Sequence, residues 1–326
     1  MKYLLMLSLL FACADPKKAN LDKRLKTYKY PFKTRLYKFL SQTHKLEMAY
    51  SIVKPEKPNG KKIVLMHGKN FSGAYWGQTA KDLSAAGYTV LIPDQIGFGR
   101  SSKPMQYQYS FHGLAQNTKR LIDWYKWDKV TVLGHSMGGM LASRFALMYP
   151  ELVDKLVLVN PIGLEDYKLK VPYETIDTVF KKQLKLKPSQ VRKYQEENYY
   201  GGRWSENYER WLKLQTGWIK GPDWQHLAYI SALTYDMIYT QPVVYEFGQL
   251  KPNTLLIIGD RDKTALGKNL VDEQTRKTMG NYPELAQKTK KSIPNSSLAL
   301  IKDVGHLPHI EAYPKFKSAL FNFLEK

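Results

Sequence analysis

The feature that most constrains the fold of this chain is the six-residue stretch GHSMGG at residues 134–139. It follows the apolar run VTVL at 130–133 and leads into a helical pattern over 137–149. A strand that reverses into a helix within so few residues needs glycines on both sides of the turn, because side chains there would collide with the neighbouring backbone. The stretch therefore predicts a sharp strand-to-helix turn with the hydroxyl of Ser136 exposed at its apex.

Such a turn also offers hydrogen-bond donors. The first backbone N–H groups of the following helix are free and lie at the positive end of its dipole. An oxyanion formed on a substrate carbonyl would find donors there, the N–H of Met137 first. The competing interpretation is an incidental serine in a glycine-bounded turn, and the rest of the chain has to decide between the two.

The surrounding sequence alternates short apolar runs with longer helical patterns. Predicted buried strands cover 63–66, 88–92, 130–133, 156–159, 254–258 and 297–301, and predicted helices cover 76–86, 111–125, 137–149, 269–291 and 314–325. Buried strands separated by helices indicate a mostly parallel, doubly wound α/β sheet that is covered on both faces. The more polar alternating run LEMAY at 46–50 predicts an edge strand or hairpin arm.

This alternation stops in the middle of the chain. Residues 164–248 contain no buried-strand run, only polar helical stretches that are rich in tryptophan and tyrosine. So much amphipathic aromatic surface beside the ligand-binding edge of a sheet predicts an inserted helical cap over a pocket, with most of the rings in the cap's own core. The α/β core then comprises residues 46–163 and 249–326.

Several chemically active residues fall at the carboxyl ends of predicted strands, which is where parallel sheets bind ligands. Ser136 and Asp94 lie there, together with the sequence HGKN at 67–70. Serine alone is a weak nucleophile, so catalysis needs a base within hydrogen-bond reach and a carboxylate that orients the base. Asp262 follows the strand predicted at 254–258, and His306 follows the last predicted strand.

The order Ser136, Asp262, His306 resembles that of the α/β-hydrolase superfamily. The loops HGKN at 67–70 and PDQIGFGRS at 93–101 are also similar to those of its members with a helical cap, a group that includes esterases, C–C bond hydrolases, epoxide hydrolases and haloalkane dehalogenases. The likeness extends from about residue 46 to 324. It implies the α/β-hydrolase fold and a serine hydrolase.

The resemblance implies a role for each member of a catalytic triad. Ser136 would be the nucleophile, which disfavours epoxide hydrolase and dehalogenase chemistry because an aspartate is expected at that position. His306 would be the general base. Asp260 and Asp262 both follow the 254–258 strand, and the family's acid three residues after a glycine favours Asp262 over Asp260. Some relatives place the acid after the strand that precedes the cap, but here that position holds Asn160, which carries no charge.

An oxyanion hole and several structural residues follow from the same resemblance. The N–H of Met137 would act with an N–H of Lys69 or Asn70, since the family uses the residue after His-Gly. Lys69 is unusual at its position and could attract an acidic substrate group, although a surface lysine is the more ordinary interpretation. We expect His135 and His309 to be structural. Asp94 resembles a carboxylate that braces its loop.

The N-terminus is predicted to be a secretory signal over residues 1–14, with Lys2 before a short apolar run. Residues 10–13, LFAC, resemble a lipobox whose Cys13 would be lipidated, whereas 12–14, ACA, also fits an ordinary signal peptidase. The position of the chain's one cysteine at the end of the apolar run favours the first interpretation. The chain is therefore expected in the bacterial cell envelope, held at the membrane by a lipid anchor, or as a periplasmic or secreted protein if an ordinary signal peptidase cleaves it. One cysteine permits no intramolecular disulfide.

Basic residues are spread along the whole chain. Lysine and arginine outnumber aspartate and glutamate by 50 to 29, which gives a net charge of +21. No nucleic-acid-binding signature accompanies this charge, so it favours solubility or general surface attraction over a specific polyanion site. Residues 15–45 are predicted to form a basic arm with short amphipathic helices.

Taken together, the motifs predict a serine hydrolase that acts on a small, apolar acyl substrate without a metal or cofactor. Hydrolysis of a carboxylic ester is the leading prediction. C–C bond hydrolase, lactonase or aminopeptidase activity on the same triad is the alternative, and a non-enzymatic scaffold of the envelope is a third hypothesis.

Overall fold

The computed structural model describes residues 20–325 of the 326-residue chain. The predicted signal segment, Cys13 and the lipid anchor lie outside these residues, so the envelope location stays a prediction. Within residues 20–325, no helix combines the length and the apolar character that crossing a membrane requires.

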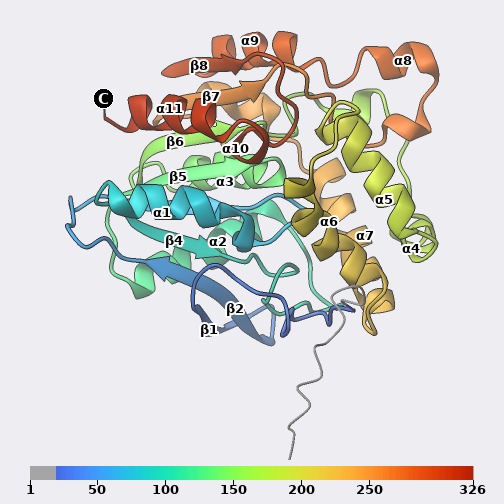
Figure 1. Ribbon diagram of the computed structural model, residues 1–326, viewed down its shortest axis with the longest axis horizontal. Helices are drawn as coiled ribbons and strands as arrows, with labels where there is room; N and C mark the ends of the chain where they lie inside the picture. The colour runs from blue at the N-terminus through green and yellow to red at the C-terminus, as the bar shows by residue number, and fades with distance from the viewer. Residues whose placement is uncertain (1–19, 326) are drawn as a thin grey trace, which may run out of the picture.

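An eight-stranded sheet forms the centre of the molecule, in the order β1-β2-β4-β3-β5-β6-β7-β8 (Figure 1). The strands are β1 (Thr34–Ser41), β2 (His44–Val53), β3 (Lys62–Met66), β4 (Thr89–Pro93), β5 (Val130–His135), β6 (Val153–Val159), β7 (Asn253–Gly259) and β8 (Ser296–Ile301). Only the pairs β1·β2 and β2·β4 are antiparallel, and the other five are parallel. The predicted mostly parallel α/β sheet is confirmed.

Helices cover both faces of the sheet because successive strand residues point to opposite sides. In β3, Ile63 and Leu65 belong to one apolar cluster, and Val64 and Met66 belong to the other. The first cluster includes side chains of α1 (Gly77–Ala85) and α11 (Tyr313–Leu324). The second includes side chains of α2 (Phe111–Trp124), α3 (Met137–Met148) and α9 (Tyr282–Ser292). Strands buried on both sides explain the unbroken apolar runs of the sequence.

The segment predicted to be a cap consists of helices, turns and loops and lies at one end of the sheet (Figure 1). Its elements are η2 (Tyr167–Leu169), α4 (Ile176–Leu184), α5 (Pro188–Tyr194), the π-helical turn η3 (Gln195–Tyr199), α6 (Glu206–Ile219), α7 (Trp224–Thr240) and η4 (Val244–Gln249). The remaining short elements are η1 (Gly73–Trp76), η5 (Lys268–Leu270), α8 (Glu273–Lys277) and α10 (Pro308–Glu311). The carboxyl-terminal ends of the strands therefore face a helical layer.

The amphipathic helices predicted in the N-terminal arm are wrong for the described part of that arm. Residues 34–41 form the edge strand β1, which pairs with β2 through a tight turn at Gln42 and Thr43. Both turn residues have positive φ, of 47° and 65°, as a two-residue hairpin turn requires. Aromatic and aliphatic residues that alternate with polar ones favour a strand, and here pairing with β2 prevails over the helical spacing. The sheet thus begins before residue 46.

The preceding residues pack on the helical segment instead of extending from it. Leu21 and Leu25 are buried in a small cluster with Leu214, Trp218 and Leu227 of α6 and α7. The backbone N–H of Leu21 donates to the carbonyl of Gly217 at 2.9 Å. The arm therefore ties the helical segment to the first strand.

Asp94 braces the loop after β4, as predicted. Its buried carboxylate, 2% exposed, accepts hydrogen bonds from the backbone N–H of Gly73 at 2.7 Å and of Arg100 at 2.7 Å. The Tyr30 hydroxyl donates to it at 2.6 Å. One side chain thus joins three loops.

We expect Asp94→Ala to lower the free energy of unfolding by about 3 kcal/mol, because two buried N–H groups lose their acceptor at about 1–3 kcal/mol each. Chemical denaturation measures the loss. Asp154→Ala, at an exposed position of β6, is the control and should stay within about 0.5 kcal/mol of the wild type. An equal effect of the two substitutions would contradict the bracing role.

Candidate active site

Ser136 lies at the apex of the turn between β5 and α3, with φ of 57° and ψ of −124°. A non-glycine residue at positive φ costs roughly 1–3 kcal/mol, so the surrounding structure must hold it. The Ser136 N–H donates to the carbonyl of Val159 at 3.2 Å, and its carbonyl accepts from the N–H of Gly139 at 2.8 Å. The serine hydroxyl is thereby presented at the edge of the sheet.

The glycines of the turn are required by close packing. A methyl group at Gly134 would lie 2.0 Å from the carbonyl oxygen of Gly138, and one at Gly138 would lie 2.4 Å from that of Met66. Both distances are far below van der Waals contact. The elbow predicted from the sequence therefore depends on glycine at these two positions.

Three predicted site residues meet in one hydrogen-bonded row. His306 Nε2 lies 2.9 Å from Ser136 Oγ, and His306 Nδ1 lies 2.6 Å from Asp262 Oδ2. Ser136 is 8% exposed, and the other two are 1% exposed. This is the geometry in which a carboxylate orients an imidazole that can take a proton from a serine.

The two candidate acids have different partners. Asp262 faces His306, and its second oxygen, Oδ1, accepts from the N–H of Thr264 at 2.8 Å. Asp260 instead accepts from the N–H of Asp303 at 2.7 Å and braces the neighbouring loop. The structure brings Asp262, and not Asp260, to the histidine.

Asn160 has a role that the sequence did not reveal. Its Nδ2 donates to Asp262 Oδ2 at 2.8 Å, and its Oδ1 accepts from the N–H of Gly259 at 2.9 Å. Asp262 Oδ2 therefore accepts hydrogen bonds from both Asn160 and His306. Some relatives place the acid itself after β6. In this chain Asn160 occupies that position and donates a hydrogen bond to the acid, Asp262.

Tyr199 of η3 is a second residue that sequence reasoning missed. Its backbone carbonyl accepts from the N–H of His306 at 3.1 Å, and its ring stacks on the imidazole with centroids 4.9 Å apart. The Tyr199 hydroxyl accepts from Asn70 Nδ2 at 2.9 Å. One tyrosine of the helical segment thus contacts both the histidine and the predicted oxyanion loop.

The loop after β3 lies directly beside the serine. A methyl group at Gly68 would lie 3.1 Å from Ser136 Cβ. Within residues 20–325, the backbone N–H groups of Lys69, Asn70 and Met137 donate to no acceptor. These groups are the ones predicted for the oxyanion hole, and they stay available to a substrate oxygen. The side chain of Asn70 is directed to Tyr199.

A buried hydrogen-bonded chain joins this loop to the histidine. The N–H of Gly68 donates to the Tyr75 hydroxyl at 2.8 Å, which lies 3.1 Å from His135 Nδ1. His135 Nε2 lies 2.8 Å from the carbonyl oxygen of His306. With Tyr75 as donor to Nδ1, His135 holds its proton on Nε2 and donates it to that carbonyl. His135 is thus a structural residue, as expected, and Tyr75 joins it as one that the sequence did not indicate.

His309 is also buried, 4% exposed, between Trp76 and His135, with ring centroids 4.5 Å and 4.6 Å away. Within the described residues, neither of its ring nitrogens has a hydrogen-bond partner. Burial holds the pKa of both His309 and His135 well below the usual value for histidine. Both rings are therefore neutral at pH 7.

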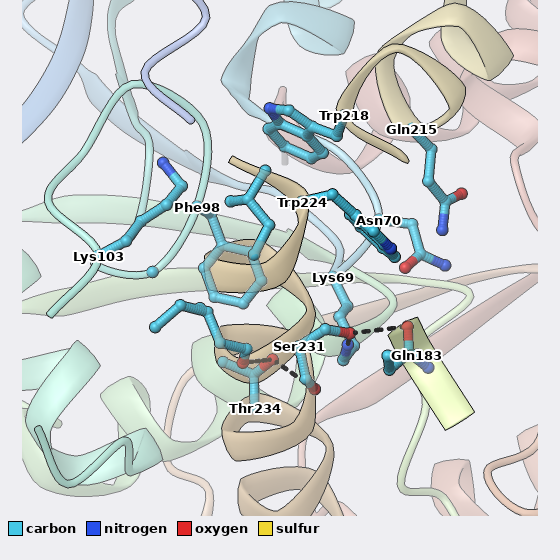
Figure 2. Close-up of a pocket in the computed structure, with 13 residues that line it drawn as sticks. Lys69, Asn70, Phe98, Lys103, Gln183, Gln215, Trp218, Trp224, Ser231 and Thr234 are labelled. Carbon is cyan, nitrogen blue, oxygen red and sulfur yellow. Dashed lines mark hydrogen bonds between the residues drawn. The ribbon is translucent and has the colours of Figure 1, made fainter. Parts of the chain in front are cut away.

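A pocket lies between the loops after β3 and β4 and the helical segment (Figure 2). It holds about 490 Å³ of empty volume, part of it open to solvent. Its apolar and aromatic side chains are Phe98, Trp218, Trp224, Leu227 and Ile230, and its polar side chains are Lys69, Asn70, Lys103, Gln183, Gln215, Ser231 and Thr234. Lys69 and Asn70 come from the loop that lies beside Ser136, whereas none of Ser136, Asp262 and His306 lines the pocket itself.

The part of the chain from 20 to 325 contains no group of three or more His, Cys, Asp or Glu side chains that could hold a metal ion.

Comparison with known proteins gives consistent relationships. The profile of the family described as alpha/beta hydrolase fold matches residues 61–313. The crystal structure of a probable hydrolytic enzyme from Pseudomonas aeruginosa PAO1 superimposes with a TM-score of 0.92 at 44% identity, over 94% of this chain and 98% of that one. Lipase 1 of Psychrobacter immobilis is 25% identical over 288 residues, 80% of this chain and 78% of the lipase.

Other matches are shorter. A 2-hydroxy-6-oxo-6-phenylhexa-2,4-dienoate hydrolase of Burkholderia cepacia is 32% identical over 126 residues, 37% of this chain and 44% of that enzyme. Uncharacterised mycobacterial proteins are 37% identical over 106 residues, and the match spans about a third of their length, 30%.

The neutral buried histidines predict a loss of stability in acid. An unfolded histidine binds a proton near pH 6.5, and a buried ring with a lowered pKa does not, so acidification below about pH 6.5 favours the unfolded state. Each such ring contributes at most about 1.4 kcal/mol per pH unit. His309→Leu should therefore reduce the difference in unfolding free energy between pH 7 and pH 5, measured by denaturation. His44→Leu on β2 is the control. If the pH dependence of His309→Leu is identical to that of the wild type, this account is wrong.

Proposed function

This chain belongs to the α/β-hydrolase fold family, and from that premise we propose that it is a serine hydrolase that cleaves carboxylic esters through an acyl-enzyme. One observation carries the proposal. The hydroxyl of Ser136, the imidazole of His306 and the carboxylate of Asp262 form a continuous hydrogen-bonded row at the carboxyl edge of the sheet.

In the proposed acylation step, Ser136 Oγ attacks the ester carbonyl carbon while His306 Nε2 takes the hydroxyl proton. Asp262 stabilises the resulting imidazolium and fixes its orientation. The carbonyl oxygen becomes an oxyanion that accepts from the N–H groups of Met137 and Lys69. When the C–O bond of the ester breaks, His306 returns the proton to the departing alkoxide, which leaves as an alcohol.

In the deacylation step, water enters and the same groups act again. His306 takes a proton from the water as its oxygen attacks the acyl carbon, and the Ser136 oxygen leaves with that proton. The products are a carboxylic acid and the regenerated enzyme. No redox step or metal ion is needed.

Two observations favour an ester as the substrate class. The pocket lined by the loop beside Ser136 has aromatic and aliphatic side chains that suit an apolar acyl or alcohol group. A relative that aligns over 80% of this chain is named a lipase. Cleavage of a C–C bond is the second candidate, because a shorter stretch of the chain is similar to a dienoate hydrolase.

Substitutions in the triad should cause large losses of ester hydrolysis. Ser136→Ala and His306→Ala should each lower kcat by about a million-fold, because the two residues act as a unit. Asp262→Asn should lower kcat by on the order of ten-thousand-fold, since it removes the charge behind the imidazole. Steady-state hydrolysis of p-nitrophenyl butyrate measures these losses.

Asp260→Asn is the matched control for the acid, since both aspartates lie in the loop after β7. It should leave kcat within about tenfold of the wild type, because its carboxylate contacts Asp303 and not His306. If Asp260→Asn is the damaging change and Asp262→Asn is mild, the assignment of the acid is wrong.

A substrate panel separates the candidate functions. We expect p-nitrophenyl esters to be hydrolysed at least about tenfold faster than amino-acid arylamides, and a fluorophosphonate probe to label the wild type but not Ser136→Ala. Faster cleavage of an arylamide, a lactone or a vinylogous 1,5-diketone would favour one of the alternatives. Failure of the probe to label the wild-type protein would favour a non-enzymatic scaffold.

A further inference from the structure

The side chain of Lys69 connects the proposed oxyanion loop to the pocket. Its backbone follows Gly68 beside Ser136, and its ammonium reaches Ser231 Oγ of α7 at 2.7 Å. Figure 2 shows Lys69, Ser231 and Gln183 pointing toward one another in the pocket. The ammonium therefore lies in the pocket between the loop beside Ser136 and the helical segment.

This charge has no counter-ion among the described residues. No aspartate or glutamate lines the pocket, and the one polar contact of the Lys69 ammonium in residues 20–325 is the neutral hydroxyl of Ser231. Burial lowers the pKa of Lys69 to about 8. An ammonium removed from water without an anion is unfavourable, so an incoming anion would gain from pairing with it.

Lys103 in the same pocket differs in how its ammonium is held. Lys103 Nζ donates to the backbone carbonyls of Gly99 at 2.6 Å and Ser101 at 3.1 Å, within its own loop. An ammonium has three hydrogens, so Lys103 retains one for further bonding and Lys69 retains two. Lys69 is therefore the better candidate to bind an anion.

A second unused donor lines the same pocket. The indole N–H of Trp224 is buried and has no acceptor in the part of the chain that the structure describes. A carboxylate has two oxygens that can accept hydrogen bonds from such donors. The pocket is thus rich in hydrogen-bond donors and lacks an acidic side chain, and its other lining side chains are apolar or neutral polar ones.

We propose that the preferred substrate of Ser136 is an ester that carries a carboxylate, and that Lys69 binds this carboxylate in the pocket. The proposal rests on the proposed ester hydrolysis. It replaces a purely apolar substrate by one that is apolar along its length and negatively charged at one end, such as a half-ester of a dicarboxylic acid. If Lys69 were instead an ordinary surface lysine, water would solvate its ammonium and no anionic partner would be needed.

The test compares esters that differ in a single charge. Hydrolysis of monoethyl adipate and diethyl adipate is followed by titration of the released acid at constant pH 7, where both products ionise. We expect the wild type to show a kcat/KM at least about tenfold higher for the half-ester, which corresponds to about 1.4 kcal/mol. A second pair, 6-butyryloxyhexanoate and its methyl ester, places the carboxylate on the alcohol side of the ester. Comparison of the two pairs shows whether Lys69 binds a carboxylate on the acyl side or on the alcohol side.

Lys69→Met removes the ammonium and keeps the length of the side chain and the backbone N–H. The selectivity ratio of the charged over the neutral ester should fall at least about tenfold, whatever happens to the absolute rates. Lys213→Met, at an exposed position of α6, removes one charge from outside the pocket and should keep the wild-type ratio. A wild-type ratio of 1 or less in both pairs, or an unchanged ratio in Lys69→Met, would overturn the proposal.

Labelling with a fluorophosphonate separates this failure from failure of the proposed function. Labelled wild-type protein with no preference for the charged ester contradicts only the role of Lys69, whereas unlabelled protein that hydrolyses neither ester contradicts both. If Lys69→Met does not fold, competition in the wild type replaces it. Hexanoate should then inhibit hydrolysis of diethyl adipate at least about tenfold more strongly than its uncharged amide, hexanamide, does, and equal inhibition would overturn the proposal.

Discussion

The site depends on one strained piece of backbone, the positive φ of Ser136 between β5 and α3. The strain of roughly 1–3 kcal/mol is held by packing that admits no side chain at Gly134 or Gly138 and by hydrogen bonds to neighbouring strands. Because parallel strands end at a common edge, the loops after β3, β7 and β8 reach the same place. The loop that carries His306 includes a second residue at positive φ, Asp303 at 59°, whose N–H donates to Asp260.

The side chains packed around His306 suit the general-base role proposed for it. Asp262 is the acid that touches the ring, and Asn160 holds its oxygen in place. Two further imidazoles, those of His135 and His309, lie close by, and a positive charge on either would oppose an imidazolium at His306. Burial lowers the pKa of both, so they remain neutral and fill the space without repelling that charge. Dense aromatic packing thus contributes to the electrostatics of the site.

Much of the fold was predictable because buried strands and amphipathic helices have different periods. Glycines and strand ends pointed to Ser136, whereas the roles of Asp262 and His306 were inferred from the resemblance to the α/β-hydrolase superfamily. The edge strand β1 was missed because its half-exposed residues fit a helical spacing as well as a strand, and only pairing with β2 decides between them. Tyr199 could not be singled out, since its contacts depend on how the helical segment packs on the sheet. The partner of Lys69 was hidden for the same reason, because Ser231 is 162 positions away in the chain.

Under the proposed function, these tertiary contacts would join substrate selection to catalysis through a single loop. Lys69 and Asn70 offer backbone N–H groups near Ser136, while their side chains bond to Ser231 and Tyr199 of the helical segment. Tyr199 also accepts from the backbone of His306. A shift of the helical segment would therefore move the walls of the pocket, the oxyanion loop and the general base together. A substrate that fits the pocket and pairs with Lys69 would stabilise the arrangement in which those groups are aligned, so binding energy far from the scissile bond can contribute to the chemical step.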